Sequence, residues 1–253
     1  MNGSLARKLA GYLGASLVLL AGWQLLSWAI GSPALPGPVP ALGAFGAGVA
    51  GGDIVPHLLS SAWRVLAATA LGTVLAVPLG LVLGRSPRLD AVAAPLIFLT
   101  YPVPKVVFLP VLLILLGLGD ASKIVLITLI VFFQLLVTAR DASRAIPPGS
   151  VLSVRSLGAG RADVFRHVVF PAALPDIFTA LRIGTGTAVA VLFLAESIAG
   201  RTGLGYYIVD AWGRLAYDAM FAGILGMALL GVALYEALEF AEARMCRWTR
   251  VGR

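Results

Sequence analysis

The sequence is poor in charge and in cysteine. Charged residues make up 12% of its 253 residues and apolar residues 59%, whereas soluble domains average about 25% and about 45–50%. We therefore expect one integral membrane domain, residues 1–253, and not a soluble globule. The single cysteine, Cys246, excludes an intrachain disulfide and a cysteine metal cluster.

Motifs of common enzymes are also missing. The three lysines are Lys8, Lys105 and Lys123, and none follows a glycine, so the chain has no phosphate-binding loop of the G-x-x-x-x-G-K-[ST] type. It has no G-x-S-x-G. His57 and His167 are predicted to lie on opposite sides of the membrane, too far apart for a metal pair or a catalytic dyad. We expect no enzymatic activity and no metal or other cofactor in this chain, and any ATP must be bound by another chain.

Long uncharged runs predict six membrane-spanning helices. A span needs roughly 20 apolar residues, so six spans would use about 120. The predicted fold is an all-α, polytopic membrane helix bundle. The predicted limits of its spans are 9–30, 63–84, 92–118, 121–140, 174–198 and 220–243. The first span is interpreted as an uncleaved helix, because its apolar run exceeds the length usual in a signal peptide.

The third predicted span is the least regular. Pro95, Pro102, Pro104 and Pro110 each remove a backbone donor, and irregular backbone at membrane depth is tolerated only where protein or a wet cavity covers it. We therefore expect this segment to face inward. A lysine at mid-helix costs about 2.5–3.5 kcal/mol on insertion scales. Lys105 should then either line a pathway, together with Pro102 and Pro104, or bond the freed carbonyls of the broken helix.

The basic residues predict the orientation. With the N-terminus inside, thirteen of the nineteen Lys and Arg residues fall on the cytoplasmic side: Arg7, Lys8, Arg85, Arg88, Arg140, Arg144, Arg155, Arg161, Arg166, Arg244, Arg247, Arg250 and Arg253. The positive-inside rule then places both termini and the 141–174 loop in the cytoplasm. The net charge of +7 is thus explained by topology, and a nucleic-acid partner is not expected.

Two apolar segments carry glycine signals. Gly31–Gly52 is rich in Pro and Gly and has no charge, which predicts an extended connector along the outer surface. Gly80 and Gly84 form a G-x-x-x-G. That spacing favours close helix packing, but it is too common to identify a dimer face.

The predicted cytoplasmic loop contains start and stop signals for two short helices. Ser150 can cap a helix that Gly158 ends, at a turn that permits positive φ, and a second segment over 161–169 should stop before Pro171. Both segments place apolar residues at helical spacing beside arginines. Such helices need a partner protein, or they lie as an interfacial pair on anionic lipid.

The same loop resembles the signature of permease subunits of bacterial ATP-binding-cassette importers, which reads Glu-Ala-Ala, a glycine, then Leu-Pro. Here Leu157-Gly158-Ala159 supplies the glycine and Leu174-Pro175 the Leu-Pro, while Leu152-Ser153-Val154 stands in place of Glu-Ala-Ala. The resemblance covers about 55–245. Further segments resemble the nitrate, sulfonate and taurine branch: Tyr101-Pro102-Val103-Pro104, Leu109-Pro110, Ala195-Glu196-Ser197, Gly203-Leu204-Gly205-Tyr206 and Phe221-Ala222-Gly223-Ile224.

The resemblance implies a type I importer permease fold in which the loop is the coupling helix, docked in a groove of a cytoplasmic ATPase subunit. The residues it assigns to coupling are Leu157, Gly158, Ala159, Arg161, Phe165, Pro171, Leu174 and Pro175. It also implies ATPase subunits that bind ATP and Mg, a second permease chain forming a homodimer, an external substrate-binding protein, and a multi-pass location in the bacterial inner membrane. Glu196 would lie in an outer gate region, unless it serves a structural ion pair.

The predicted function is that of a permease subunit in an ATP-driven importer. The positive charge of Lys105 favours a small anion as the substrate. The resemblance suggests nitrate, a sulfonate or taurine, or else a vitamin precursor such as a pyrimidine or riboflavin. A carrier driven by an ion gradient is the alternative. It would need an ionisable site at mid-membrane, where only Lys105 is predicted to lie. An integral-membrane enzyme is disfavoured, because no His, Asp or Ser constellation falls at one membrane level.

Overall fold

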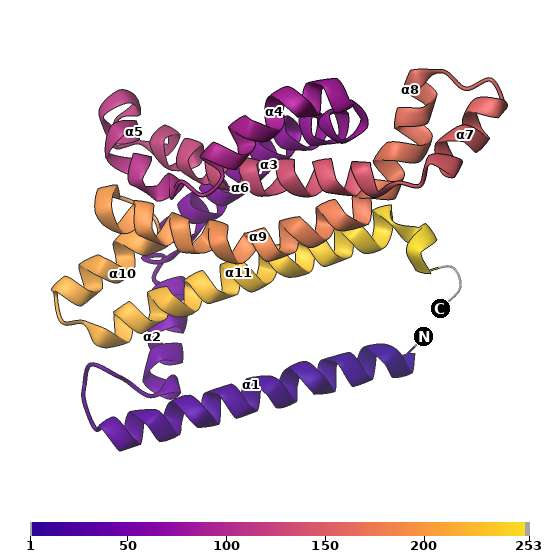
Figure 1. Ribbon diagram of the computed structural model, residues 1–253. Helices are drawn as coiled ribbons and strands as arrows, with labels where there is room; N and C mark the ends of the chain where they lie inside the picture. The colour runs from indigo at the N-terminus through magenta and orange to yellow at the C-terminus, as the bar shows by residue number, and fades with distance from the viewer. Residues whose placement is uncertain (1, 251–253) are drawn as a thin grey trace.

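The computed structural model describes residues 2–250, with side chains described over 10–248, and this part of the chain is helical without strands (Figure 1). The helices are α1 (Asn2–Ile30), α2 (Pro38–Ala50), α3 (Val55–Arg85), α4 (Pro87–Thr100), α5 (Leu109–Leu116), α6 (Asp120–Ala145), α7 (Pro148–Ser156), α8 (Arg161–Val164), α9 (Phe170–Ala199), α10 (Leu204–Gly213) and α11 (Tyr217–Met245). Shorter turns are η1 (Lys105–Phe108), the π-helical η2 (Phe165–Val169) and η3 (Arg247–Arg250).

Five helical segments are long and apolar enough to cross a membrane: Ala10–Ile30, Val55–Arg85, Asp120–Ala145, Arg161–Ala199 and Tyr217–Met245. A sixth is a broken span, in which Pro87–Thr100 and Lys105–Leu116 meet at an angle of 79°. The break falls at the prolines that predicted an irregular third span. The all-α fold is confirmed, and six spans are counted if the bent pair is one.

Helices α3 and α6 pack most extensively and form the centre of the bundle. Glycines on α3 make this close approach possible, because a Cβ at Gly80 would lie 2.6 Å from the carbonyl oxygen of Leu136. Gly84 sits in the same way against the carbonyl of Arg140. The G-x-x-x-G therefore serves helix packing within the chain.

The predicted extended connector over Gly31–Gly52 is wrong in its second half, which forms α2. Pro38 and Pro40 fall in the first turn of this helix, where backbone N–H groups have no intrahelical partner, so two prolines cost it no hydrogen bond. Helix α2 packs against α11. The apolar, Ala-rich stretch after the prolines thus gains a partner surface that a solvated connector would lack.

The prediction that helix ends before Pro171 is also wrong. Helix α8, the π turn and α9 run on as one 39-residue helical segment, Arg161–Ala199. A proline ring would clash with the carbonyl four residues earlier and removes one N–H. The π turn absorbs this misfit, since Phe170 N–H bonds the carbonyl of Phe165, five residues back. Only two short breaks, at 146–147 and 157–160, interrupt helix in the predicted loop.

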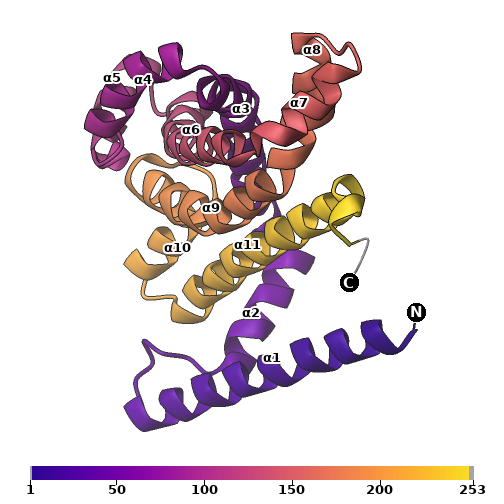
Figure 2. The ribbon, with the colours of Figure 1, turned by 45° about the vertical axis from the view of Figure 1, so that its right-hand side comes forward.

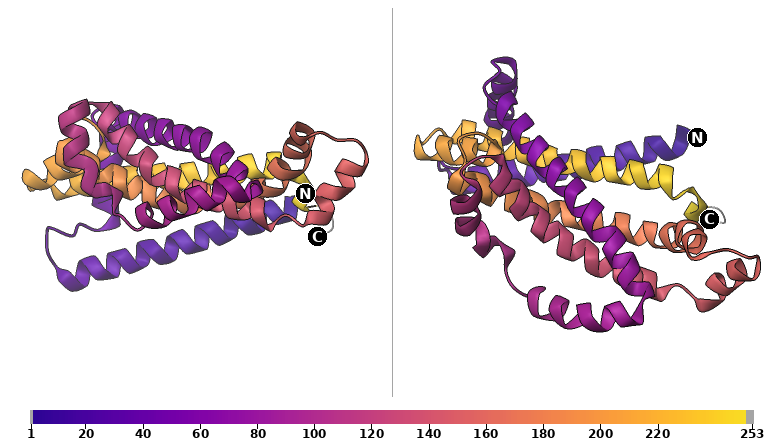
Figure 3. Two further views of the ribbon diagram at one scale, coloured as in Figure 1. Left: turned by 45° about the horizontal axis from the view of Figure 1, so that its top comes forward. Right: turned by 90° about the horizontal axis from the view of Figure 1, so that it is seen from above.

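Both termini and the α7–α8 hairpin lie at one end of the bundle, and α5 and α10 at the other (Figures 1 and 2). The hairpin extends beyond the ends of the neighbouring helices (Figure 3). Helix α1 lies at the edge of the bundle, where Trp23 stacks on Phe221 of α11. The hairpin and the two ends of the described chain therefore lie at the same end of the bundle. The side chains of Arg7, Lys8 and Arg250, and the whole of Arg253, lie outside the described residues.

Candidate functional site

Helix α7, the first helix of the α7–α8 hairpin, begins at two prolines and ends before a glycine with positive φ. Helix α7 starts at Pro148 with Pro147 as its extended N-cap, so Ser150, the predicted cap, lies inside the first turn. Proline is favoured at this first position because its fixed φ is already helical. The helix ends as predicted before Gly158, whose φ is +86° and whose N–H bonds the carbonyl of Arg155 at 2.9 Å.

Two leucines of the hairpin face away from the bundle. Leu152 is 63% and Leu157 86% exposed, whereas Val151, next to Leu152 in the chain, is 5% exposed. The tip therefore presents an apolar surface outside the packed part of the chain.

The structure divides the predicted coupling residues into two groups. Leu157, Gly158, Ala159 and Arg161 lie at the tip of the hairpin or at the start of α8. The others belong to the helical segment that joins the hairpin to the bundle. Of these, Phe165 packs against the core and Leu174 is 7% exposed, and Pro171 and Pro175 lie in the first two turns of α9. The first group lies at the tip of the hairpin, and the second group joins this tip to the bundle.

Lys105 lies at the sharp break between α4 and α5 and caps the end of α4. Its Nζ donates to the carbonyl oxygens of Thr100 at 2.7 Å and Tyr101 at 2.6 Å, and lies 4.4 Å from the centre of the Phe133 ring. The carbonyl of Thr100 is the one that Pro104, four residues on, cannot bond. Lys105 therefore bonds the freed carbonyls of the broken helix, which is one of its two predicted roles. Its side chain is half-buried.

The broken span lies at the periphery of the single chain. Asp90 is the one buried residue described in α4, and Leu109 the one in α5. Asp90 is held by Arg140, whose Nη2 lies 3.0 Å from its Oδ2, and by Arg144. Within one chain, therefore, this segment does not face inward as expected. Lys105, and not packing against other helices, bonds the carbonyls that the break leaves free.

Near the opposite end, Glu196 is buried in a network of charges and hydroxyls. Its side chain is inaccessible to solvent, Arg64 Nη1 lies 2.7 Å from its Oε1, and Ser61 Oγ donates to Oε2 at 2.8 Å. Arg64, itself 3% exposed, also donates through Nε to Oδ1 of Asp120 at 2.8 Å. These contacts match the structural ion pair, which is one of the two roles predicted for Glu196.

This network fixes the turn between α9 and α10. Gly205 N–H donates to Glu196 Oε2 at 2.9 Å, and Arg64 donates to both the carbonyl and the hydroxyl of Thr202. Gly203 adopts φ +110° and ψ 159°, a region used almost only by glycine. A Cβ there would collide with the Glu196 carboxylate.

A signal for this network is present in the sequence but was not used to predict it. Arg64 falls within a long apolar helix, and such a charge needs an acidic partner at the same membrane level. Arg64 and Glu196 are 132 positions apart in the sequence, so no local pattern pairs them. Two ionisable residues at the same end of different spans are the pattern that indicates such a pairing.

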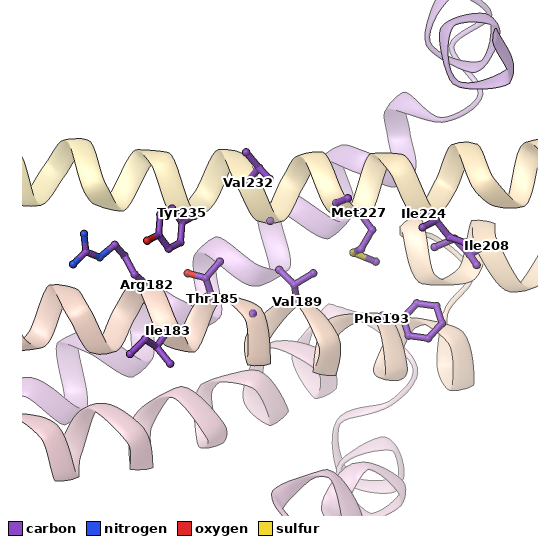
Figure 4. Close-up of a pocket in the computed structure, with 13 residues that line it drawn as sticks. Arg182, Ile183, Thr185, Val189, Phe193, Ile208, Ile224, Met227, Val232 and Tyr235 are labelled. Atoms are coloured by element: carbon purple, nitrogen blue, oxygen red, sulfur yellow. The ribbon is translucent and has the colours of Figure 1, made fainter. Parts of the chain in front are cut away.

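A groove of about 680 Å³ runs between α9 and α11 (Figure 4). Its walls are apolar and include Val189, Phe193 and Met227. Arg182 lies toward one end, with its Nη1 2.9 Å from Oε2 of Glu242 on α11. The ion pair joins the two helices, and the remaining lining has few groups that could hold a polar solute.

Comparison with known proteins identifies a family and a fold. Residues 76–246 match the family described as the binding-protein-dependent transport system inner membrane component. The taurine transport system permease protein TauC of Escherichia coli is 35% identical over 192 residues, 76% of this chain and 70% of that protein. A permease named for aliphatic sulfonates transport, SsuC of the same organism, is 30% identical over 233 residues, 91% of this chain and 88% of that protein. An inward-facing structure of the MetNI methionine ABC transporter has a chain that matches with a TM-score of 0.60 at 21% identity, over 77% of this chain and 94% of that one.

Proposed function

Because this chain belongs to the family of inner membrane components of binding-protein-dependent transport systems, it is the permease component of an ATP-binding-cassette importer, and we propose that its α7–α8 hairpin couples it to the ATPase subunit. It is a multi-pass inner membrane protein and not an enzyme. Importers of this kind work with a separate ATPase and an external substrate-binding protein. We further propose that two copies of this chain form the translocation pathway, with the hairpin end in the cytoplasm.

The exposed tip of the hairpin is the observation that carries this proposal. Leu157 leaves 86% of its surface uncovered, and Gly158 turns the chain back through a positive φ. A short helix held between Pro148 and Gly158 can move as a unit and transmit the closure of an ATPase dimer. Such coupling requires contacts that differ between two states, and the two exposed leucines can supply them. The helix continues through α8 and the π turn into α9, so a displaced tip would pull on a membrane span.

The names of the relatives support a small sulfonate such as taurine as the substrate. Selectivity is expected to rest mainly with the external binding protein. Within this chain, Lys105 is proposed to face the pathway beside Pro102 and Pro104, where its positive charge would favour an anion. Two of its three donor positions are taken by carbonyls, which leaves one for a passing solute.

Substitution at Gly158 tests the coupling proposal. Valine is a conformational outlier at positive φ, so Gly158→Val should displace the tip and weaken ATPase binding or uncouple hydrolysis from uptake. Permease, ATPase and binding protein would be reconstituted in liposomes, and subunit retention, ATP hydrolysis and taurine uptake measured. Gly149→Val is the matched control, since Gly149 lies in α7 at negative φ and a Cβ added there would meet no heavy atom within 4 Å.

Uptake that falls in Gly158→Val but not in Gly149→Val supports the hairpin as the coupling element. Normal retention, hydrolysis and uptake in Gly158→Val would refute it. Taurine uptake by wild-type liposomes that needs an ion gradient but no ATP would instead favour the gradient-driven carrier. A complex that hydrolyses ATP and transports a different solute would overturn only the substrate.

A further inference from the structure

A second groove lies where the turn between α3 and α4 meets the α7–α8 hairpin. Its volume is about 620 Å³, and both elements line it. Figure 3 shows the turn beside the hairpin at the end of the bundle. Four arginines line this groove, namely Arg85, Arg88, Arg155 and Arg161, and no acidic residue does.

The four arginines are not neutralised within the described part of the chain. Asp90 is the nearest buried acid in sequence, but Arg140 and Arg144 already hold it. Asp163, on α8, accepts a hydrogen bond from the N–H of Gly160. Four guanidinium groups around one groove repel one another, and an anion held between them would relieve that repulsion.

The floor of the groove is apolar. Val151, Val164 and Val169 line it and are 5%, 6% and 2% exposed, and Phe165 lies beside them. A free inorganic anion would gain nothing from such a floor, whereas a phosphodiester carrying glycerol and acyl groups would cover it. Arginine presents a planar fork of donors that matches phosphate oxygens.

The position of the groove also suits a lipid. Arg85 is the last residue of the span α3, and Arg88 lies in the first turn of α4, which re-enters the apolar zone. Residues that join two membrane-crossing segments are expected near the depth where phospholipid phosphates lie. Leu152 and Leu157, the exposed leucines proposed to meet the ATPase, do not line the groove, whereas Arg161 does. The two surfaces therefore adjoin at the start of α8.

We propose that this groove binds the phosphate headgroup of an anionic phospholipid. Basic pockets between membrane helices on the cytoplasmic side recognise such headgroups. The inner-leaflet assignment rests on the proposed cytoplasmic placement of the hairpin. Binding by detergent-solubilised protein does not depend on that placement, so the site and the topology can fail separately.

The experiment measures lipid retained by purified permease. Wild type would be mixed in detergent with equal amounts of phosphatidylglycerol and phosphatidylcholine, passed over a sizing column, and its bound lipid counted by mass spectrometry. Arg85→Gln/Arg88→Gln should lower phosphatidylglycerol retention about thirtyfold, because two juxtamembrane bases that attract anionic lipid are removed. Arg244→Gln/Arg247→Gln removes the same charge from the same end, outside the groove, and should retain as much as wild type. Arg85→Lys/Arg88→Lys, which keeps the charge without the fork, should fall between the two glutamine variants.

Three results would overturn the proposal. The first is equal retention in wild type and in Arg85→Gln/Arg88→Gln, measured on a sizing peak that shows both folded. The second is displacement of phosphatidylglycerol by excess inorganic phosphate, which would make this a site for the free anion. The third is loss of the lipid when the ATPase subunit is added, which would assign the groove to the subunit interface.

Discussion

The contacts of Glu196 show how one carboxylate can hold three segments together. It pairs with Arg64 on α3, accepts from Ser61, and bonds the N–H of Gly205 at the start of α10. A buried ion pair contributes little over an apolar pair of the same shape, but removal of one partner leaves the other charge buried and uncompensated. Replacing Glu196 alone should therefore destabilise the fold more than replacing Glu196 and Arg64 together.

Glu196→Gln is expected to destabilise the permease by about 3 kcal/mol, at the low end for breaking a buried pair because Asp120 still faces Arg64. The thermal unfolding midpoint of the purified protein measures this. Asp210→Asn is the control, since the Asp210–Arg214 pair is exposed and such pairs contribute about 0–1 kcal/mol. Equal midpoints for the two variants would show that the buried network is not a stabilising centre.

At Lys105, uptake and stability measurements separate the two possible roles. Lys105→Met removes the donor to two carbonyls and the positive charge beside Phe133. If Lys105 faces the pathway, taurine uptake should fall while the assembled complex is retained, and Lys105→Arg should keep part of the uptake. A lower unfolding midpoint with unchanged uptake and unchanged concentration dependence would reduce the lysine to the cap of α4.

At the scale of elements, the α3–α6 contact depends on residues without side chains. Gly72, Gly80 and Gly84 follow one face of α3 and let the backbones approach closely, as small residues do in membrane helix pairs. Lipid tails are as apolar as leucine, so packing and not water exclusion holds such helices together. Any added volume in this contact therefore acts directly on the fit of the two helices.

Gly84→Ala should destabilise the bundle by about 1–3 kcal/mol, the usual cost of overpacking, because the added methyl group meets the backbone of Arg140. Gly22→Ala, in the exposed α1, places its methyl group where no atom lies within 4 Å and should leave the unfolding midpoint unchanged or raise it. Both midpoints would be measured in the same detergent. A Gly84→Ala midpoint equal to that of Gly22→Ala would mean that α3 and α6 do not pack this closely in the membrane.

At the scale of the whole molecule, the arrangement of the ends predicts which surfaces a cell exposes. Both termini and the hairpin lie at one end of the bundle, and α3, α6 and α11 each carry a predicted cytoplasmic arginine near their C-terminal end. Helix α2 lies toward the other end, against the N-terminal half of α11. Moving these arginines across a membrane is costly, so the orientation is expected to be unique.

Cysteine labelling checks this topology. An impermeant thiol reagent added to intact cells should label Gly46→Cys, an exposed position on α2, and should label Ser150→Cys only after the membrane is opened. The native Cys246 is 1% exposed and should give little background. Labelling of Ser150→Cys from outside would invert the assignment, and with it the proposed contact between hairpin and ATPase.

The sequence by itself determined the features that one segment decides alone. Apolar length sets a membrane span because the bilayer core imposes the same requirement on every helix. The break in the third span follows from Pro102 and Pro104, which remove donors wherever they lie. The end of α7 at Gly158 also follows locally, since a turn with positive φ selects glycine. The family resemblance rested on the same kind of local signal, in the hairpin and the residues after it.

Only the tertiary structure decided what depends on a distant partner. The pairing of Arg64 with Glu196 joins residues on different spans, and nothing near either residue in the chain specifies the other. Helix α2 forms where the sequence predicted a connector, because α11 offers it a surface. Pro171 does not end its helix, because a π turn shifts the hydrogen bonds by one residue, and the packing of Phe165 and Val169 against the core holds that turn in place. Local rules state what a residue prefers, whereas packing decides which preferences are overruled.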